Sequence, residues 1–290
     1  MNSETSPDDV KVSGLFFYPV KSCGGISIAK ATLETTGLAH DREWMLVDTR
    51  HNPARFLTQR EHPELATVGL TLHLATGELT LSRAGAAPLT VARPTDRSKL
   101  LRVKVWSAEV FGIDAGDAAA QWFAALLGGS AAQVRLVYFH REYPRFCNTK
   151  YAGDVGATTY FADGYPVLVT NQASLDDLNR RANRSAERAL PMNRFRPNVV
   201  LSGLPAWDED HIDTLTVGSS LLKLVKPCVR CEITTTDQAT GSRLSDEPLN
   251  TLARFRNNPD LGGVTFGWNA IVLNAGELAV NQPASVEYRF

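Results

Sequence analysis

Short runs of β-branched and aromatic residues, separated by turn residues, recur along most of this sequence and constrain its fold more than any other feature. Between residues 10 and 81 they read LFFYPV, ISIAKATLE, EWMLVD, ATVGLTLHLA and ELTLS. Runs of this length and composition are typical of β-strands. Two segments place a glycine between apolar runs, a pattern that predicts β-hairpins: LHLATGELTLS and IVLNAGELAV.

Helical patterns are few by comparison. We expect helices in DAAAQWFAALLG, QASLDDLNRRA and EPLNTLARFR, the first capped by Asp117 and ended by Gly128. Further strands are predicted in RVKVWSAEVFGID, VRLVYF, PNVVLSG, HIDTLTVGSSLLKLVK and CEITTTD. The sequence therefore predicts a mainly β fold with some helices (α+β). We expect two β-barrel domains, over residues 10–135 and 136–290, rather than a parallel α/β sheet.

Charge and cysteine content narrow the class of protein. The 290 residues include 30 Lys and Arg against 31 Asp and Glu, a formal net charge of −1. A binder of nucleic acid polymers usually carries a basic excess, so we expect no such partner, although a small basic pocket fits within a neutral average. The polar, acidic N-terminus and the short apolar runs predict a cytoplasmic protein with no membrane partner. Four cysteines are too few for a disulfide framework in a chain of this size.

Two of the four cysteines stand three positions apart in KPCVRCEITTTDQATG, at residues 226–241. A structural zinc site is disfavoured, because Cys23 and Cys147 are isolated and the six histidines lack the paired spacing of a zinc finger. A redox dithiol is also disfavoured, because it prefers the start of a helix and this pair precedes a predicted strand. The residues alone leave open one reactive thiolate beside a bystander, or two buried cysteines that behave as small hydrophobic residues.

The neighbourhood of Cys231 favours a reactive thiolate. Arg230 adjoins this cysteine and Lys226 lies close behind it, and nearby cations stabilise a thiolate over a thiol. A thiolate is also a ligand that the heavier transition metals prefer. The following TTTDQATG offers hydroxyl groups and a turn at Gly241, so several hydrogen-bond donors can face one pocket.

Six segments in a fixed order resemble the MOSC-domain molybdenum enzymes. YPVKSCGG and GLAHDREWMLVD are similar to the family's N-terminal β-barrel, and FADGYPVLVTNQASLDDLN, NRFRPNVVLSG, KPCVRCEITTTDQATG and FGWN to its MOSC domain. The ADGYP and FG-x-N forms resemble the bacterial branch that reduces N-hydroxylated bases more than the mitochondrial amidoxime-reducing component. The resemblance runs from Leu15 to about Val286 and implies a MOSC N-terminal barrel followed by a MOSC barrel.

The resemblance implies a molybdenum cofactor, held as a molybdopterin or its nucleotide form. Cys231 matches the protein ligand of the metal, and Cys228 matches a bystander. Positions 164 and 165 differ from the amidoxime-reducing component and have no assigned role. The resemblance also implies which other side chains contact the cofactor: Lys21, Ser22, Arg42, Arg196, Asn198, Arg230 and Asn269.

Two of these arginines stand in unusual places for surface residues. Arg42 lies within a predicted apolar strand beside Trp44, and Arg196 lies between Phe195 and Pro197. A buried arginine without a counter-charge is costly, so an anionic ligand would explain both.

By the same resemblance, the expected activity is reduction of small N-hydroxylated compounds, namely hydroxylamines, amidoximes and N-hydroxylated bases, to amines or amidines. Electrons are expected from a separate redox protein, because the sequence lacks a C-x4-C-x2-C cluster pattern and a dinucleotide fingerprint. An alternative from another class is a non-catalytic carrier of the cofactor or a sulfur-relay module, since a scaffold does not decide function.

Three remaining features carry weaker signals. WDEDHID at 207–213 could hold a hard metal ion, but an acidic loop between strands is the preferred interpretation. Gly24 and Gly25 could form either an anion-binding nest or a simple turn. Cys23 and Cys147 have no predicted role.

Overall fold

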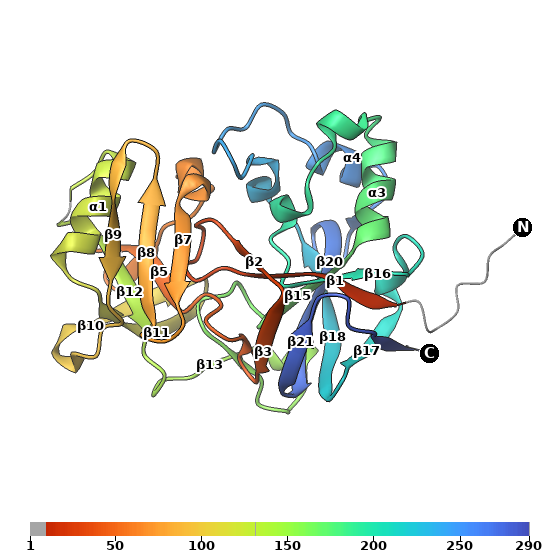
Figure 1. Ribbon diagram of the computed structural model, residues 1–290, viewed down its shortest axis with the longest axis horizontal. Helices are drawn as coiled ribbons and strands as arrows, with labels where there is room; N and C mark the ends of the chain where they lie inside the picture. Colours follow the sequence, from red (N-terminus) through yellow and green to blue (C-terminus); the bar gives the residue numbers. More distant parts are fainter. Residues whose placement is uncertain (1–9, 131, 290) are drawn as a thin grey trace, which may run out of the picture.

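The computed structural model describes residues 10–130 and 132–289, and within them strands far outnumber helices. Figure 1 shows two halves side by side, one built mainly from residues before 140 and the other mainly from residues after it. The prediction of a mainly β fold with some helices is confirmed. None of the helices in these residues is long and apolar enough to cross a membrane.

A closed five-stranded barrel forms the centre of the N-terminal half, as predicted. The strand order is β10 (Leu100–Val105), β11 (Ala108–Asp114), β12 (Val134–Phe139), β5 (Trp44–Asp48) and β6 (Ala54–Phe56). The parallel pairing of β6 with β10 closes the barrel. All five residues of β5 are buried, so its sequence WMLVD lacks the alternation of a half-exposed strand. Packed beside the barrel are helix α1 (Asp117–Leu127) and a sheet of β7 (Gly69–His73), β8 (Glu78–Arg83) and β9 (Ala86–Val91).

One large sheet organises the C-terminal half. Its strands run in the order β2 (Ile26–Ile28), β1 (Lys11–Phe17), β16 (Val199–Ser202), β15 (Val167–Asn171), β20 (Gly263–Asn274), β18 (Ser220–Val229), β17 (Ile212–Val217) and β22 (Ser285–Tyr288), with β19 (Asn257–Asn258) attached to β20. β1 and β2 precede the barrel in the sequence yet belong to this sheet. The chain therefore starts in this half, builds the barrel and returns. The predicted boundary at residue 135 stays a prediction.

The prediction of a second closed barrel is wrong, because this sheet stays open. Its two sides approach each other through a single bridge between Lys11 of β1 and Pro283, which precedes β22. Backbone N–H groups of Asn281 and Ala284 donate to the start of the chain, at Val12 and Val10. The Val12 N–H donates back to the Gln282 carbonyl, so hydrogen bonds flank Pro283 on both sides, and the contact between the two sides of the sheet is limited to this single bridge.

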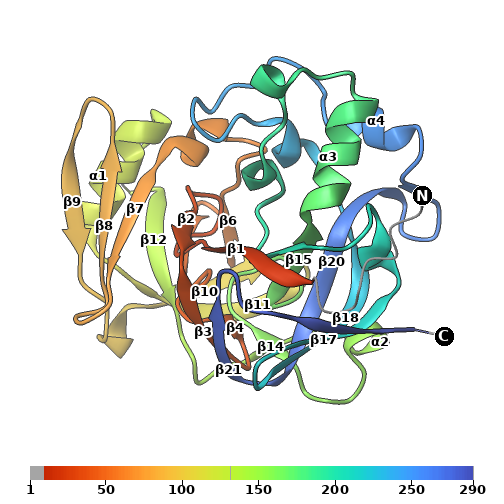
Figure 2. The same cartoon turned by 45° about the vertical axis from the view of Figure 1, so that its right-hand side comes forward.

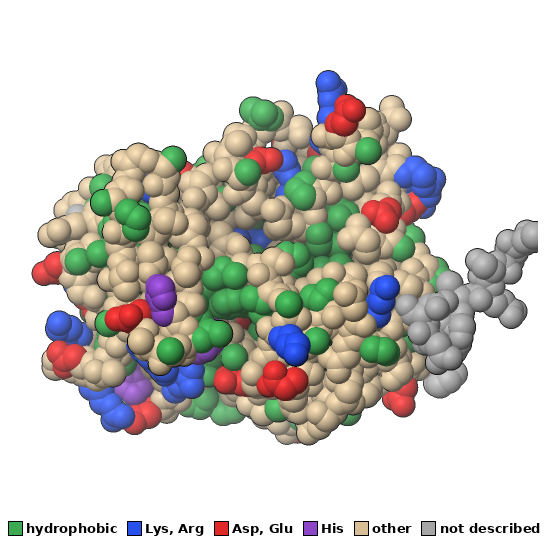
Figure 3. Space-filling model, viewed as in Figure 1, with side chains coloured by type: hydrophobic (Ala, Val, Ile, Leu, Met, Phe, Trp, Pro, Cys, Tyr) green, Lys and Arg blue, Asp and Glu red, His purple; other side chains and the backbone are tan. Residues whose placement is uncertain are grey.

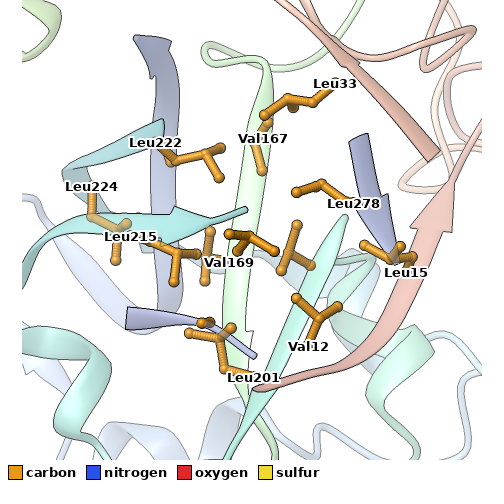
Figure 4. Close-up of a cluster of buried hydrophobic side chains, with 14 of the residues drawn as sticks. Val12, Leu15, Leu33, Val167, Val169, Leu201, Leu215, Leu222, Leu224 and Leu278 are labelled. Atoms are coloured by element: carbon orange, nitrogen blue, oxygen red, sulfur yellow. The ribbon is translucent and has the colours of Figure 1, made fainter. Parts of the chain in front are cut away.

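Figure 4 shows the apolar cluster that holds this half together. Leu15 from β1 and Leu278 from β21 (Gly276–Ala279) meet Val169 from β15, so both ends of the chain contribute to one core. β21 pairs with β3 (Lys30–Glu34), as Figure 2 also shows, and β3 pairs with β4 (Gly37–Leu38). The predicted hairpin in IVLNAGELAV is therefore wrong: burial of Leu278 against this core directs β21 away from β20.

Two further strand predictions need correction. CEITTTD forms a 3-10 turn, η7 (Glu232–Thr235), because the hydroxyls of Thr234 and Thr235 donate to carbonyls three residues back and compete with a strand. The predicted single strand RVKVWSAEVFGID is a hairpin of β10 and β11, which turns at Trp106. The hairpin predicted in LHLATGELTLS is present as β7 and β8.

The three predicted helices exist. Gly128 ends α1 in the left-handed conformation, as predicted, but Asp117 is its first residue rather than its cap and pairs with Arg135. α3 (Gln172–Arg181) is capped by the Asn171 side chain, and α4 (Leu249–Ala253) begins directly after Pro248. The remaining α-helix and strands are α2 (Thr149–Ala152), β13 (Arg145–Phe146) and β14 (Thr158–Thr159).

Candidate functional site

A cavity lies where loops of the barrel half meet loops of the large sheet. Figure 3 shows the molecular surface hollowed between the two halves, with Lys or Arg side chains at the bottom of the hollow. All eight residues that the sequence singled out line this one cavity: Lys21, Ser22, Arg42, Arg196, Asn198, Arg230, Cys231 and Asn269. Residues 164 and 165 line it too. The structure thus brings the predicted residues together, while their individual roles toward a cofactor stay predictions.

Three of these residues occupy left-handed backbone conformations that only glycine adopts readily. Their φ angles are 70° for Ser22, 49° for Arg42 and 55° for Arg196. Arg42 lies in the turn before β5, not within an apolar strand as expected, and its N–H donates to the Tyr18 carbonyl. Backbone strain of this kind concentrates at functional sites, where the surrounding structure maintains it.

Arg42 and Arg196 both stack on the ring of Tyr18, each with its guanidinium carbon 4.2 Å from the ring centroid. Arg42 donates to Asp41 Oδ2 at 2.5 Å and to Asn198 Oδ1 at 3.1 Å. Arg196 donates from Nη1 to a backbone carbonyl at 2.7 Å. Burial lowers the pKa of Arg196 to about 10 and raises the pKa of Asp41, although Arg42 opposes the second shift. Desolvated cations of this kind favour an anion beside them.

Lys21 is almost completely buried and forms an ion pair at the cavity wall. Its Nζ donates to Asp163 Oδ1 at 2.6 Å and to the Phe161 carbonyl at 2.8 Å. Burial lowers the pKa of Lys21, and Asp163 opposes that shift. The Lys21 ammonium holds the pKa of the Asp163 carboxyl below its ordinary value. The contact with Asp163 therefore favours the charged form of Lys21.

The two neighbouring cysteines differ in exposure and in their cationic partners. Cys231 is exposed, and Arg60 Nη1 lies 3.6 Å from its sulfur. Cys228 is half-buried, and Arg230 Nη1 lies 2.8 Å from its sulfur. The expectation that Arg230 lies beside the sulfur of Cys231 is therefore wrong, because the guanidinium turns back to the other thiol.

The sequence analysis missed Arg60 and Asp163 as cavity residues. Arg60 follows the barrel strand β6 and reaches Cys231, a residue 171 positions later. No local pattern in TQREHP identifies it. Asp163 belongs to the segment FADGYP, but its value as a partner of Lys21 depends on a contact across 142 positions. Contacts of this kind become visible only in the folded structure.

The weaker sequence candidates lie outside the cavity lining. Glu209 of WDEDHID is fully buried and accepts hydrogen bonds from Ser174 and Asn171, so this carboxylate anchors the start of α3. No group of three or more potential metal ligands of the His, Cys, Asp or Glu type occurs in the described residues. A side chain at Gly24 or Gly25 would clash at 2.6 or 2.4 Å, so close packing explains both glycines. The four cysteines are free thiols.

Two profiles of protein families match this chain in the order of its two halves. The MOSC N-terminal beta barrel domain matches residues 9–130, and the MOSC domain matches residues 157–285. Fold and site thus define a two-domain MOSC protein.

Among similar proteins, mitochondrial amidoxime-reducing component 1 of Mus musculus is 35% identical over 84% of this chain and 71% of its own. The Homo sapiens component 1 is 33% identical over 94% of this chain and 81% of its own. Molybdenum cofactor sulfurase of Oryza sativa is 29% identical over 100% of this chain but 35% of its own. The chain belongs to the MOSC family that includes the mitochondrial amidoxime-reducing components.

Proposed function

We propose that this protein is a molybdenum cofactor-dependent reductase of N-hydroxylated compounds. Hydroxylamines, amidoximes and N-hydroxylated bases would be reduced to amines or amidines, with electrons from a separate redox protein. The similarity to amidoxime-reducing components supports the reaction class. The observation that carries the proposal is one cavity in which an exposed thiol, Cys231, lies among a cluster of cations.

The charges and donors of the cavity fit an anionic pterin cofactor. Five cations line it, against one lining carboxylate, Asp163: Lys21, Arg42, Arg60, Arg196 and Arg230. Two polar atoms at its wall, Nε of Arg230 and the Tyr165 hydroxyl, are buried and have no partner in the described part of the chain. Arginine is well suited to phosphate because its planar donors bind two oxygens at once.

The residues divide into holding and ligating groups. Arg196 and Arg230 would hold the anionic parts of the cofactor, and Cys231 would supply a thiolate ligand to its metal. When bound, the cofactor supplies the two-electron chemistry that removes oxygen from an N–O bond. The backbone at Ser22, Arg42 and Arg196 is held in left-handed conformations. This part of the cavity wall therefore keeps one geometry, and little reorganisation is needed on binding.

The test is a metal analysis followed by an assay. Protein from cells that make the cofactor is expected to contain close to one molybdenum per chain. With an artificial electron donor it should reduce 6-hydroxylaminopurine and benzamidoxime. Full molybdenum occupancy without reduction of any N-hydroxylated compound would contradict the reductase and support a cofactor carrier instead.

A further inference from the structure

Trp106 occupies a turn position at which the fold does not require a tryptophan. It lies at the tip of the hairpin between β10 and β11, with a φ of 57°. Glycine or asparagine makes such a turn without strain, whereas a bulky residue in this conformation is rare. The residue is also 47% exposed, so burial does not offset the strain. A bulky side chain at a strained and exposed position points to a role of its own.

Three contacts hold the indole, and all three partners line the cavity. Its Nε1–H donates to Asp163 Oδ1 at 3.1 Å. The Arg60 guanidinium lies 4.6 Å from the ring centroid, and the Phe56 ring lies 5.3 Å away at an interplanar angle of 65°. Trp106 is thus fixed at the rim, beside the arginine that approaches Cys231.

The rim offers two chemical features to a ligand. A half-exposed indole stacks on flat aromatic rings in general, because every such ring has a π face. Asp163 directs Oδ1 to Lys21 and Trp106, while 72% of its side chain is exposed and Oδ2 has no partner among the residues described. A free carboxylate oxygen accepts N–H groups, and it binds them more strongly than a neutral acceptor does.

We infer that Trp106 is a specificity-determining residue, whose indole and the neighbouring Asp163 carboxylate select planar N-hydroxylated compounds with amidine-like N–H groups. Aromatic amidoximes and N-hydroxylated purine bases have this chemistry. This inference rests on the proposed reductase function. A small, non-planar hydroxylamine gains nothing from the indole and reaches the cavity without it.

A comparison of two substrates tests the inference in the molybdenum-loaded enzyme. In Trp106→Ala the KM for 6-hydroxylaminopurine should rise about fivefold or more, because stacking of one base contributes about 1–3 kcal/mol. The KM for N-methylhydroxylamine should not change. Trp106→Phe keeps an aromatic face and should restore most of the affinity for the purine. An equal rise for both substrates, or no rise for either, would overturn the inference.

Binding without turnover provides a readout that does not depend on reduction. Calorimetric titration of the oxidised holoenzyme with 6-hydroxylaminopurine, without a donor, should give a Kd weaker by about fivefold or more in Trp106→Ala. Tyr143→Ala removes another half-exposed aromatic outside the cavity lining and serves as the matched control, with no change expected. Melting curves check that both variants are folded.

The two proposals fail in distinguishable ways. Purine binding that depends on Trp106, in a protein that reduces no N–O bond, would contradict the reductase and support the rim as a binding site. If the purine were reduced with a Kd and a KM that do not change in Trp106→Ala, the role of Trp106 in selectivity would be contradicted. The proposed reductase function would not be affected.

Discussion

Four of the five cations that line the cavity fall into two electrostatic states, according to the half that supplies them. The fifth, Arg60 of the barrel half, forms no ion pair with a carboxylate of the described residues. Lys21 and Arg42, which come from the segment leading into the barrel, are each paired with a carboxylate. Arg196 and Arg230, which come from the half with the large sheet, donate to backbone carbonyls at 2.7 Å. No carboxylate in the described residues lies within ion-pair distance of these two arginines.

This difference indicates which cations bind an anionic ligand and which stabilise the folded protein. A paired cation attracts a further anion weakly, because its carboxylate already cancels most of its field. An arginine without a carboxylate partner keeps its full charge, and burial makes that charge costly without a counter-ion. We therefore expect the two arginines of the sheet half to bind the cofactor. We expect the paired cations Lys21 and Arg42 to stabilise the protein.

The largest expected effect concerns the two thiols of the sheet half. Cys231→Ser should remove molybdenum and abolish reduction, because the metal loses its protein ligand. Cys228→Ser should keep both, with at most a small loss of stability. Metal analysis and an N–O reduction assay of the two purified variants provide the measurement. Equal loss of molybdenum in both would indicate a site with two thiolate ligands and refute the assignment.

The second prediction compares one arginine from each half. Arg42→Gln leaves Asp41 buried and unpaired, so the free energy of unfolding should fall by about 3–5 kcal/mol. Arg196→Gln should instead weaken cofactor retention about tenfold or more, the contribution of charged hydrogen bonds. Urea unfolding of cofactor-free protein and molybdenum content after dialysis measure the two effects.

A double variant provides the control for this comparison. Asp41→Asn combined with Arg42→Gln removes both buried charges and should recover much of the lost stability. If Arg196→Gln proved the more destabilising single change and Arg42→Gln the one that releases molybdenum, the division between the two halves would be wrong.

The smallest expected effect tests whether the sheet half is stabilised independently of the cavity. Burial raises the pKa of Glu209 from 4.5 to about 7. The folded protein therefore retains a proton that the unfolded chain releases between those values. The free energy of unfolding should fall as pH rises through this window, by up to about 3 kcal/mol in total.

Glu209→Gln should flatten this pH dependence, since the amide does not titrate. Urea unfolding between pH 4.5 and 8 of both proteins measures it. Molybdenum content should stay unchanged in the variant, because Glu209 lies outside the cavity lining. An unaltered pH slope would show that the titrating group lies elsewhere.

Much of the site could be predicted because its residues lie in short segments with strong local character. The arginine after Phe195 and the serine after Lys21 belong to such segments, and each occupies a strained turn that a local sequence can specify. Arg60 and Trp106 could not be found in this way. Their significance comes from contacts with Cys231 and Asp163, which the sequence places far away.

The sequence by itself determined the β-rich class, the first barrel, the three helices and their approximate positions. These follow from periodicity, turn chemistry and the preference of Gly128 for a left-handed conformation, all of which act over a few residues. Only the tertiary structure decided that the second sheet stays open, that β21 pairs with β3, and that Arg230 contacts Cys228 rather than Cys231. Strand pairing and the direction of a long side chain depend on which distant segments compete for the same partners, and no local pattern records that competition.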